Sequence, residues 1–438
     1  MEKWTTELKS IAKLVENKDS LLIIGPPGIG KSDFLTNLAS NNIRQKYLGR
    51  ISDHLLSIRI NTEELAEISA LEFYRYTVKR FLEIINNSGF PLKIDEDEEK
   101  LLNLKDSLFL IEKIKSIITI LVQNGWQLLI IIDSFDCIGE GLDAAFFSNL
   151  KSFRDIGKYN VSYLLTATKD PSKENYFEKV YPLYKLVSPF IFYLKPSRME
   201  ESLAEIETHS KQRSIKLTKE ESLYIANLCG RYPSLVKASI QKLTSSSKKP
   251  LELTTEDLLE NSGIKFRIIE IFQSLGETER GILLKIAAKE IINKNSEAYQ
   301  LLIAKGFIEN ERIFSPLFER FLILQNTEND STTEKSENKV NGEHDIVLDP
   351  LTRLVYRNGG EVVNLTKQEY RFLHYLYTNS GKICEREEVA DAVWGGSDGV
   401  SDEAIDQVMT RLRSKLEKDK SNPVHLVTIR GRGFTFKP

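Results

Sequence analysis

Two separated segments carry residues whose types and spacing could hold a nucleotide. The first, LLIIGPPGIGKSDFLTNLA, contains Gly25, Gly28, Gly30, Lys31 and Ser32 in the spacing GxxxxGK[ST]. Glycines let successive backbone N–H groups wrap around phosphate oxygens, the lysine places a positive charge beside the β and γ phosphates, and the serine hydroxyl is a ligand for Mg²⁺. The motif follows an apolar run and opens a helical pattern, which is the context it requires. This segment predicts binding of ATP or ADP with Mg²⁺.

The second segment, QLLIIIDSFD, ends an apolar run with an acidic group. The five aliphatic residues 128–132 predict a strand buried on both faces, with Asp133 at its carboxyl end, where open parallel sheets bind ligands. We expect Asp133 to hold Mg²⁺ through water, together with Ser32; the alternative is an Asp that only caps the next helix. Many ATPases place Glu directly after this Asp to orient the attacking water, but here Ser134 follows and Asp136 is the nearest substitute. At most a slow ATPase that serves as a switch is expected.

Three further apolar runs, 55–61, 161–171 and 190–196, predict the remaining strands of a five-stranded parallel sheet. This number is typical of the α/β phosphate-loop class in which an extra strand separates the phosphate loop from the Asp strand. Thr166 and Thr168 come at the same sheet edge, where either hydroxyl could sense the γ-phosphate. The alternative, a hydroxyl that only satisfies a strand end, has equal weight.

A different chemistry is predicted at the end of the chain. In the segment from Ser401 to Leu416, apolar residues recur at helical spacing and leave a polar, cationic face made by Gln407, Thr410, Arg411 and Ser414. The following segment HLVTIRGRGFTFKP predicts a β-hairpin carrying Thr428, Arg430 and Arg432, with Gly431 and Gly433 permitting a tight bend close to another surface. The chain as a whole has 60 Lys+Arg against 63 Asp+Glu, a net charge of −3, but this end is locally basic. A helix followed by a basic hairpin predicts a winged helix that contacts DNA.

The pattern continues upstream through LTKQEYRFLHYLYTNSGKICEREEVADAVWG, residues 365–395. From about residue 345 to 438 the chain resembles the OmpR/PhoB-type winged-helix output domain of bacterial regulators. It matches the family's blocks LT-x-x-E, G-x-x-x-x-R-x-x-L, ID-x-x-I-x-x-LR-x-KL and T-x-RG-x-G-Y/F, with Val389 for the usual Leu and Phe434 for the usual Tyr.

This resemblance implies binding to double-stranded DNA. Arg411 and Arg413 would lie at the major groove or its flanking phosphates, and Thr428 and Arg430 would address the backbone and minor groove. In the family, the loop corresponding to 394–400 can touch RNA polymerase, which is therefore a further expected partner.

After the last predicted strand the chain becomes helical, with a Gly230-Arg231-Tyr232-Pro233 turn between two helices. With the phosphate loop and Asp133, this turn resembles the GxP element of STAND-type signalling ATPases and related AAA+ proteins, over residues 1 to about 250. The resemblance implies that Pro233 lies close to the nucleotide and that Arg231 acts as a sensor; a simple helix–helix turn is the alternative. The family's strand ending in Thr-x-Arg appears here as Thr166-Ala167-Thr168-Lys169, which leaves the arginine's role unfilled.

These patterns divide the chain into five parts: an ATPase core at 1–195, a helical lid at 196–250, a STAND-associated winged helix at 251–324, a linker at 325–344 and the DNA-binding winged helix at 345–438. The first winged helix contains FIENERIFSP as a short hairpin but lacks a basic helix, so we expect it to pack on the ATPase. The linker has almost no apolar residues, and a flexible tether of this length spans about 25 Å.

Composition places this multidomain protein in the cytoplasm. Three distant cysteines form no disulfide framework, the histidines form no metal constellation, and neither a signal sequence nor a membrane span is visible, so no membrane partner is expected. The preferred function is a transcription regulator in which ATP binding, through a nucleotide-dependent homo-oligomer, controls the DNA-binding domain. The alternatives are a DNA-remodelling or loading ATPase and a STAND-like defence sensor.

Overall fold

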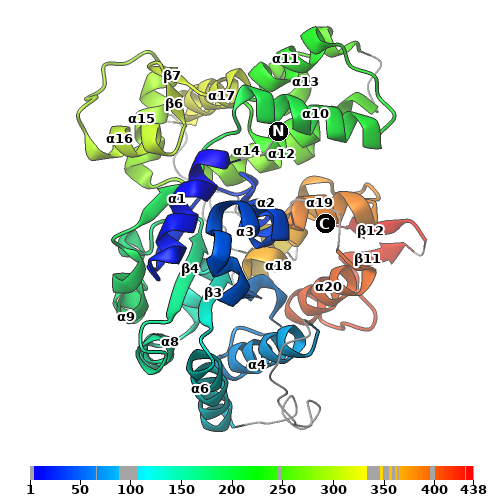
Figure 1. Ribbon diagram of the computed structural model, residues 1–438. Helices are drawn as coiled ribbons and strands as arrows, with labels where there is room; N and C mark the ends of the chain where they lie inside the picture. Colours follow the sequence, from blue (N-terminus) through cyan, green and yellow to red (C-terminus); the bar gives the residue numbers. More distant parts are fainter. Residues whose placement is uncertain are drawn as a thin grey trace. The chain divides into compact units, whose positions relative to one another are not determined.

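The structure is a computed structural model. It describes residues 4–65, 67–87, 106–244, 248–332, 346–348, 355–357, 361–363, 365–394, 400–429 and 431–437. The chain folds as two compact units, residues 1–195 and 196–438 (Figure 1).

The first unit is built on a five-stranded parallel sheet. Its strands are β1 (Leu21–Ile24), β2 (Leu55–Asn61), β3 (Gln127–Asp133), β4 (Val161–Ala167) and β5 (Ile191–Tyr193), in the order β2-β3-β4-β1-β5. The pairs β1–β4, β1–β5, β2–β3 and β3–β4 are all parallel. Because β4 lies between the strand before the phosphate loop and the strand that ends in Asp133, the predicted fold class and strand number are confirmed.

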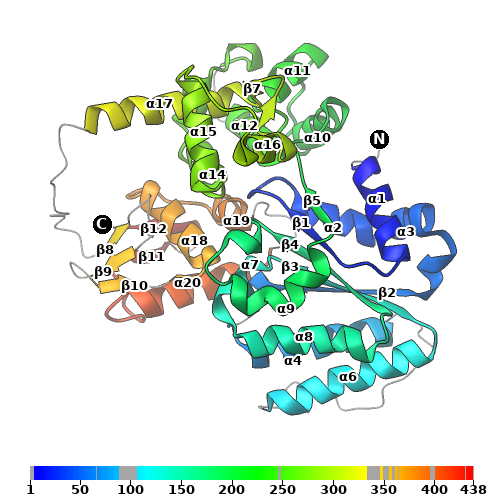
Figure 2. The ribbon, with the colours of Figure 1, turned by 90° about the vertical axis from the view of Figure 1, so that its left-hand side faces the viewer.

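Helices cover both faces of this sheet, as Figure 2 shows. Their bounds are α1 (Thr5–Glu16), α2 (Lys31–Ala39), α3 (Asn41–Leu48), α4 (Ala70–Asn87), α6 (Ser107–Gln123), α7 (Asp136–Gly141), α8 (Ala144–Ile156) and α9 (Phe177–Val187), with 3-10 turns η1 (Gly49–His54), η2 (Thr62–Glu64) and η3 (Pro171–Lys173). Along β2, Leu56, Ile58 and Ile60 join the core formed with α4, α6, α8 and α9. Since side chains alternate along a strand, Arg59 points to the opposite face, which α1, α2 and α3 cover.

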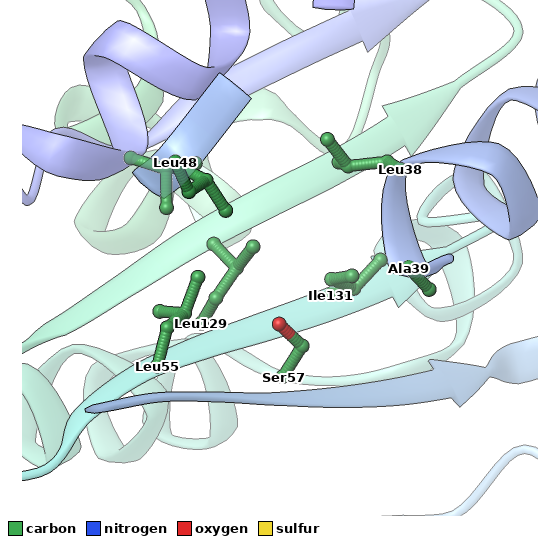
Figure 3. Close-up of a pocket in the computed structure, with 8 residues that line it drawn as sticks. Leu38, Ala39, Leu48, Leu55, Ser57, Leu129 and Ile131 are labelled. Carbon is green, nitrogen blue, oxygen red and sulfur yellow. The ribbon is translucent and has the colours of Figure 1, made fainter. Parts of the chain in front are cut away.

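A small apolar gap lies between the sheet and these three helices, and Figure 3 shows its lining. Leu38, Leu48, Leu55 and Leu129 surround a space of only ≈ 10 Å³. A volume of this size holds about one water at most, so the gap is a packing defect and not a binding site.

The second unit begins with helices and a short hairpin. These elements are α10 (Met199–Gln212), α11 (Lys219–Leu228), α12 (Pro233–Thr244), η4 (Pro250–Glu252), α13 (Thr255–Leu259), α14 (Ser262–Gln273), α15 (Glu277–Ala287), α16 (Glu297–Ala304), β6 (Ile308–Glu309), β7 (Arg312–Ile313) and α17 (Pro316–Thr332). The antiparallel pairing of β6 with β7 confirms the hairpin predicted in FIENERIFSP. Helix α17 continues through Thr332, so the first part of the predicted linker is helical. Residues 333–344 of that linker lie outside the described residues.

The chain ends in a winged helix with its own core. A three-stranded antiparallel sheet, β8 (Ile346–Leu348), β9 (Val355–Arg357) and β10 (Glu361–Val363), precedes α18 (Lys367–Thr378), α19 (Arg386–Trp394), α20 (Asp402–Leu416) and the hairpin β11 (Leu426–Ile429) with β12 (Gly433–Phe436). Apolar residues of all three helices and both sheets meet in one cluster that includes Phe372, Leu412 and Phe434. The predicted helix followed by a hairpin is confirmed.

None of the helices in the described part of the chain has the length and apolar character needed to cross a membrane.

Candidate nucleotide and DNA sites

The phosphate loop joins β1 to α2 and has the backbone of an anion cradle. Gly28 and Gly30 have φ angles of +74° and +100°, in the left-handed region that favours glycine. A Cβ on Gly25 would lie 2.8 Å from Ile29 Cγ2, so a side chain has no room there. Helix α2 begins at Lys31 without a side-chain cap, so the positive end of its dipole faces the loop.

The lysine of this loop lies across the cradle. Lys31 Nζ donates to the carbonyl oxygens of Gly25 at 2.5 Å and Pro26 at 3.3 Å. Ser32 is exposed in the first turn of α2, where its hydroxyl is accessible to a metal ion beside the phosphates. The loop therefore fits a nucleotide polyphosphate.

Asp133 lies at the carboxyl end of β3, as predicted, and is buried. Its Oδ2 accepts a hydrogen bond from the Arg59 guanidinium at 2.5 Å. Its Oδ1 accepts hydrogen bonds from the Thr166 hydroxyl at 2.5 Å and the Ser134 backbone N–H at 3.1 Å. Both oxygens thus have partners from the chain itself, and Arg59 supplies the countercharge that a buried carboxylate requires.

The two threonines have different surroundings. Thr166 is fully buried, and its hydroxyl holds Asp133 while accepting a hydrogen bond from Ser134 N at 3.0 Å. Thr168 is partly exposed, and its backbone N–H donates to Asp136 Oδ2 at 2.6 Å. Asp136, at the start of α7, therefore ties this helix to the loop after β4.

Sequence reasoning missed the polar residues at the end of β2. The parallel register pairs Asn61 with Asp133, so the following turn η2 lies beside Ser134. There the Ser134 hydroxyl donates to Glu63 Oε1 at 3.1 Å, and Thr62 Oγ1 donates to the Ser134 carbonyl at 2.7 Å. Ser134 itself has a φ of +57°, a strained conformation for a non-glycine residue that these contacts stabilise. The signal in the sequence was only LSIRINTEE, a strand that ends in charged residues.

The edge of the sheet at Asp133 also fits Mg²⁺, provided that Arg59 releases one oxygen of Asp133. Magnesium in nucleotide sites usually takes one or two protein ligands, with phosphate oxygens and water completing its shell. Ser32 and Asp133 offer such a pair, and no cluster of three His, Cys, Asp or Glu residues suited to a metal occurs in the described ranges. Because Arg59 holds one Asp133 oxygen, we expect it to move when the metal binds.

Arg231 and Pro233 belong to the second unit. Arg231 has a φ of +59° and forms an ion pair with Glu309 of β6, and Pro233 is the first residue of α12. The preceding Gly230 packs against Phe314, where a Cβ would lie 2.5 Å from Phe314 Cδ2. The turn thus joins the helical region to the small hairpin, and its predicted roles beside a nucleotide remain predictions.

Helix α20 presents the predicted polar face. Ser401 caps it by accepting from Ala404 N at 3.2 Å, and Ile405, Val408, Met409, Leu412 and Leu416 are buried. Gln407, Thr410 and Ser414 are exposed on the other side, while Arg411 is half-buried. Thr410 Oγ1 also donates to the Asp406 carbonyl at 2.8 Å.

Arg413 has a partner that the sequence did not predict. Its Nε donates to the Leu426 carbonyl at 2.9 Å and its terminal NH₂ to Thr428 Oγ1 at 2.7 Å, so one guanidinium joins α20 to the wing strand β11. Burial lowers the pKa of this guanidinium, although at neutral pH it stays charged. Two of the predicted DNA-contacting residues, Arg413 and Thr428, therefore contact each other.

The wing is held in place from two more sides. The buried Glu417 carboxylate accepts from the backbone N–H groups of Val424, His425 and Leu426 at 2.6–3.0 Å. At Gly433, with a φ of +138°, a Cβ would lie 2.0 Å from the Cys384 carbonyl oxygen, which confirms the predicted close approach to another surface. Arg432 is exposed at the tip, whereas Arg430 and residues 395–399 lie outside the described residues.

Comparison with known proteins identifies the C-terminal domain. Residues 360–436 match the family described as "Transcriptional regulatory protein, C terminal". The sensory transduction protein RegX3 of Mycolicibacterium smegmatis is 46% identical over 83 residues, which are 19% of this chain and 36% of that protein. The chain thus spans about a third of that relative's length. The predicted OmpR/PhoB-type winged helix is confirmed.

Two solved structures resemble parts of the chain. The Klebsiella pneumoniae RstA DNA-binding domain, in complex with the RstA box, has 31% identity and a TM-score of 0.21, covering 23% of this chain and 98% of that one. A Walker-type ATPase of Pyrococcus abyssi has 18% identity and a TM-score of 0.47, covering 73% of this chain and 95% of that one.

Proposed function

We propose that this protein is a transcription regulator whose DNA binding is switched by ATP or ADP. The observation that carries the proposal is the pairing, in one chain, of a phosphate loop shaped for a nucleotide with a winged helix of the transcriptional regulatory family. The ATPase unit would decide when the DNA-binding domain acts, in the manner of STAND-type and AAA+ proteins.

In the first unit, the loop from Gly25 to Ser32 would bind the phosphates, with Lys31 turning from the loop carbonyls to the β and γ phosphates. Bound Mg²⁺ would neutralise phosphate charge, held by Ser32 and, through water, by Asp133. Thr166 keeps Asp133 oriented. Thr168 lies at the edge of the sheet that would face the γ-phosphate. By the resemblance to the GxP element, Arg231 and Pro233 remain proposed nucleotide-binding residues.

In the second unit, α20 would enter the major groove of double-stranded DNA. Its exposed Gln407 and Thr410, with the half-buried Arg411, would face the bases and nearby phosphates. Arg413 would fix the angle between α20 and the wing, and Thr428, Arg430 and Arg432 would place the wing on the backbone. RNA polymerase is a further proposed partner, through the loop after α19.

Oligomerisation would turn nucleotide binding into a large change in DNA affinity. A shift from mostly inactive to mostly active, from 1:99 to 99:1, requires a preference of about 5.5 kcal/mol for one state. Two DNA-binding domains in one assembly would bind tandem half-sites together, which multiplies their affinities. We propose a nucleotide-dependent homo-oligomer for this reason.

The test measures binding of the full chain to genomic fragments with ATP and Mg²⁺, with ADP and Mg²⁺, and without nucleotide. The proposal expects one nucleotide state to bind selected fragments at least about ten times more tightly than the others. Equal binding in all three states would refute the switch while leaving DNA binding intact.

Glu63 favours one alternative, a DNA-loading or remodelling ATPase. Its carboxylate beside Ser134 could orient an attacking water, which the residue after Asp133 cannot do. Hydrolysis that DNA accelerates strongly would favour this alternative, and slow hydrolysis unaffected by DNA would favour the switch.

A further inference from the structure

Helix α18 of the DNA-binding domain is buried on both sides. Its apolar face, with Phe372, Leu373 and Leu376, packs into the domain's own core. The opposite face carries Gln368, Arg371 and His374, polar residues that an amphipathic helix would normally expose to water. All three are nevertheless less than 9% exposed, so a second surface must cover them.

The helical region that precedes the domain covers Arg371 and His374. Arg371 Nε lies 2.5 Å from Glu270 Oε1 of α14, and both side chains are almost fully buried. Beside this pair, the Phe266 and His374 rings lie 4.6 Å apart between their centroids. Ser262, the first residue of α14, donates to Asn379 Oδ1 at 2.7 Å.

Helix α19 contributes a second group of charged contacts. Asp391 Oδ1 lies 3.2 Å from Lys237 Nζ of α12, and its carbonyl oxygen accepts from Arg267 of α14 at 3.0 Å. A polar cavity of ≈ 290 Å³ lies along the same contact with α12 and α14. Its lining includes Lys242, Glu385 and Glu388. The contact is therefore complementary in charge but incompletely packed.

We propose that this contact is a latch that controls the DNA-binding domain. The latch face, made by Arg371, His374, Asn379 and Asp391, docks on α12 and α14 of the same chain and opens when the protein is activated. The inference rests on the proposed nucleotide switch and names the surface through which it acts.

The composition of the contact supports a reversible interface. A permanent domain contact is mostly apolar, whereas this one depends on paired charges whose burial is costly and whose net contribution to stability is small. The latch face includes no residue of α20 or of the wing, so the exposed Gln407 and Thr410 stay uncovered by α12 and α14. The closed latch restricts the movement of the DNA-binding domain. The domains of two chains then cannot occupy two tandem half-sites at the same time.

Variants of the full chain that open the latch or lock it closed test this proposal. Glu270→Arg places a like charge against Arg371 and opens the latch, and the exchange Glu270→Arg with Arg371→Glu restores opposite charges. Ser262→Cys with Asn379→Cys, joined by oxidation, locks it closed, and reduction of the same sample releases it. Glu207→Arg is the matched control, since Glu207 pairs with Lys211 on the exposed face of α10.

The probe is a DNA duplex with two copies of a half-site selected from random sequence by the wild-type chain. Without ATP, Glu270→Arg should bind it about ten times more tightly than wild type, and ATP should add little. The exchange variant and Glu207→Arg should behave as wild type. The oxidised cysteine pair should bind at least about ten times more weakly with ATP than after reduction, while oxidation leaves wild type unchanged.

Equal affinities of the Glu270→Arg, locked and wild-type proteins would overturn the latch, whether or not ATP acts on wild type. If ATP changes nothing in wild type but Glu270→Arg still binds more tightly, the latch stands and the nucleotide switch fails. If Glu270→Arg does not fold, the locked pair decides, because it keeps every buried charge paired.

Discussion

The Arg59 guanidinium lies 2.5 Å from the carboxylate of Asp133, the residue expected to hold Mg²⁺. Asp133 is 2% exposed and Arg59 29% exposed, so the arginine reaches from the edge of the sheet onto a buried charge. Arg59 thus compensates Asp133 in the way that a metal would. Mg²⁺ and Arg59 should therefore compete for the carboxylate of Asp133.

Replacing Arg59 with Met should make the first unit depend on Mg²⁺. Without the metal the buried Asp133 loses its countercharge, and we expect a loss of about 2–3 kcal/mol in the free energy of unfolding. ATP with Mg²⁺ should restore most of this loss, as measured by calorimetry with and without EDTA. Arg75→Met, which breaks a pair with Glu72 on α4, is the control. A variant whose stability does not respond to Mg²⁺ would show that Arg59 and the metal do not share Asp133.

Glu63→Gln should slow ATP hydrolysis at least about tenfold and leave ATP affinity unchanged, because a neutral amide is a poor general base. The adjacent Glu64 is a matched control, since its carboxylate accepts instead from Asn61 and Tyr76. Phosphate release at saturating ATP gives the rate and titration calorimetry gives the affinity. Equal rates for Glu63→Gln and wild type would remove Glu63 from the reaction.

Lys31→Ala should abolish measurable nucleotide binding, because it removes the positive charge of the phosphate loop. Loss of one charge-assisted contact to phosphate typically costs about 1.5–3 kcal/mol, and Lys31 is expected to reach both the β and the γ phosphate. Titration with a fluorescent ADP measures the effect, with Lys151→Ala on α8 as the control. Retained affinity in Lys31→Ala would refute the phosphate-loop assignment.

The sequence predicted elements with strong local patterns and missed contacts between elements distant in the chain. The apolar run ending at Asp133 and the glycine spacing before Lys31 were sufficient for the Asp strand and the loop, whereas the strand between β1 and β3 was expected only from the phosphate-loop class. Arg59 could not be found in this way, because only the parallel register of β2 and β3 brings it to Asp133. Arg371 was missed for a similar reason, since a polar face on a helix normally indicates solvent.

Gly433→Ala should strongly destabilise the winged helix. The new Cβ would overlap the Cys384 carbonyl oxygen, and the positive φ adds strain, so we expect a loss of about 3 kcal/mol or more. Gly431→Ala is a close control: its φ is +70°, but a Cβ there meets open space, and about 1 kcal/mol is expected. Thermal unfolding measures both. Similar losses for the two variants would show that the Cys384 contact is unimportant.

Arg411→Ala and Arg413→Ala should weaken DNA binding in different ways. If Arg411 reaches a base edge, its loss costs about 1–3 kcal/mol in specific binding and leaves non-specific binding nearly unchanged. Arg413→Ala should weaken binding to all sequences and lower the stability of the domain, because it frees the wing from α20. Binding to selected and scrambled duplexes, with thermal unfolding, separates the two. A uniform loss for Arg411→Ala would assign Arg411 to phosphate instead.

The most direct test of nucleotide control is one titration of the full chain onto genomic fragments, with and without ATP and Mg²⁺, with mass measured by light scattering in the same samples. ATP should change the number of chains in the assembly and the DNA affinity together, and Lys31→Ala should show neither change. An assembly and an affinity that both stay the same when ATP is bound would rule out nucleotide control.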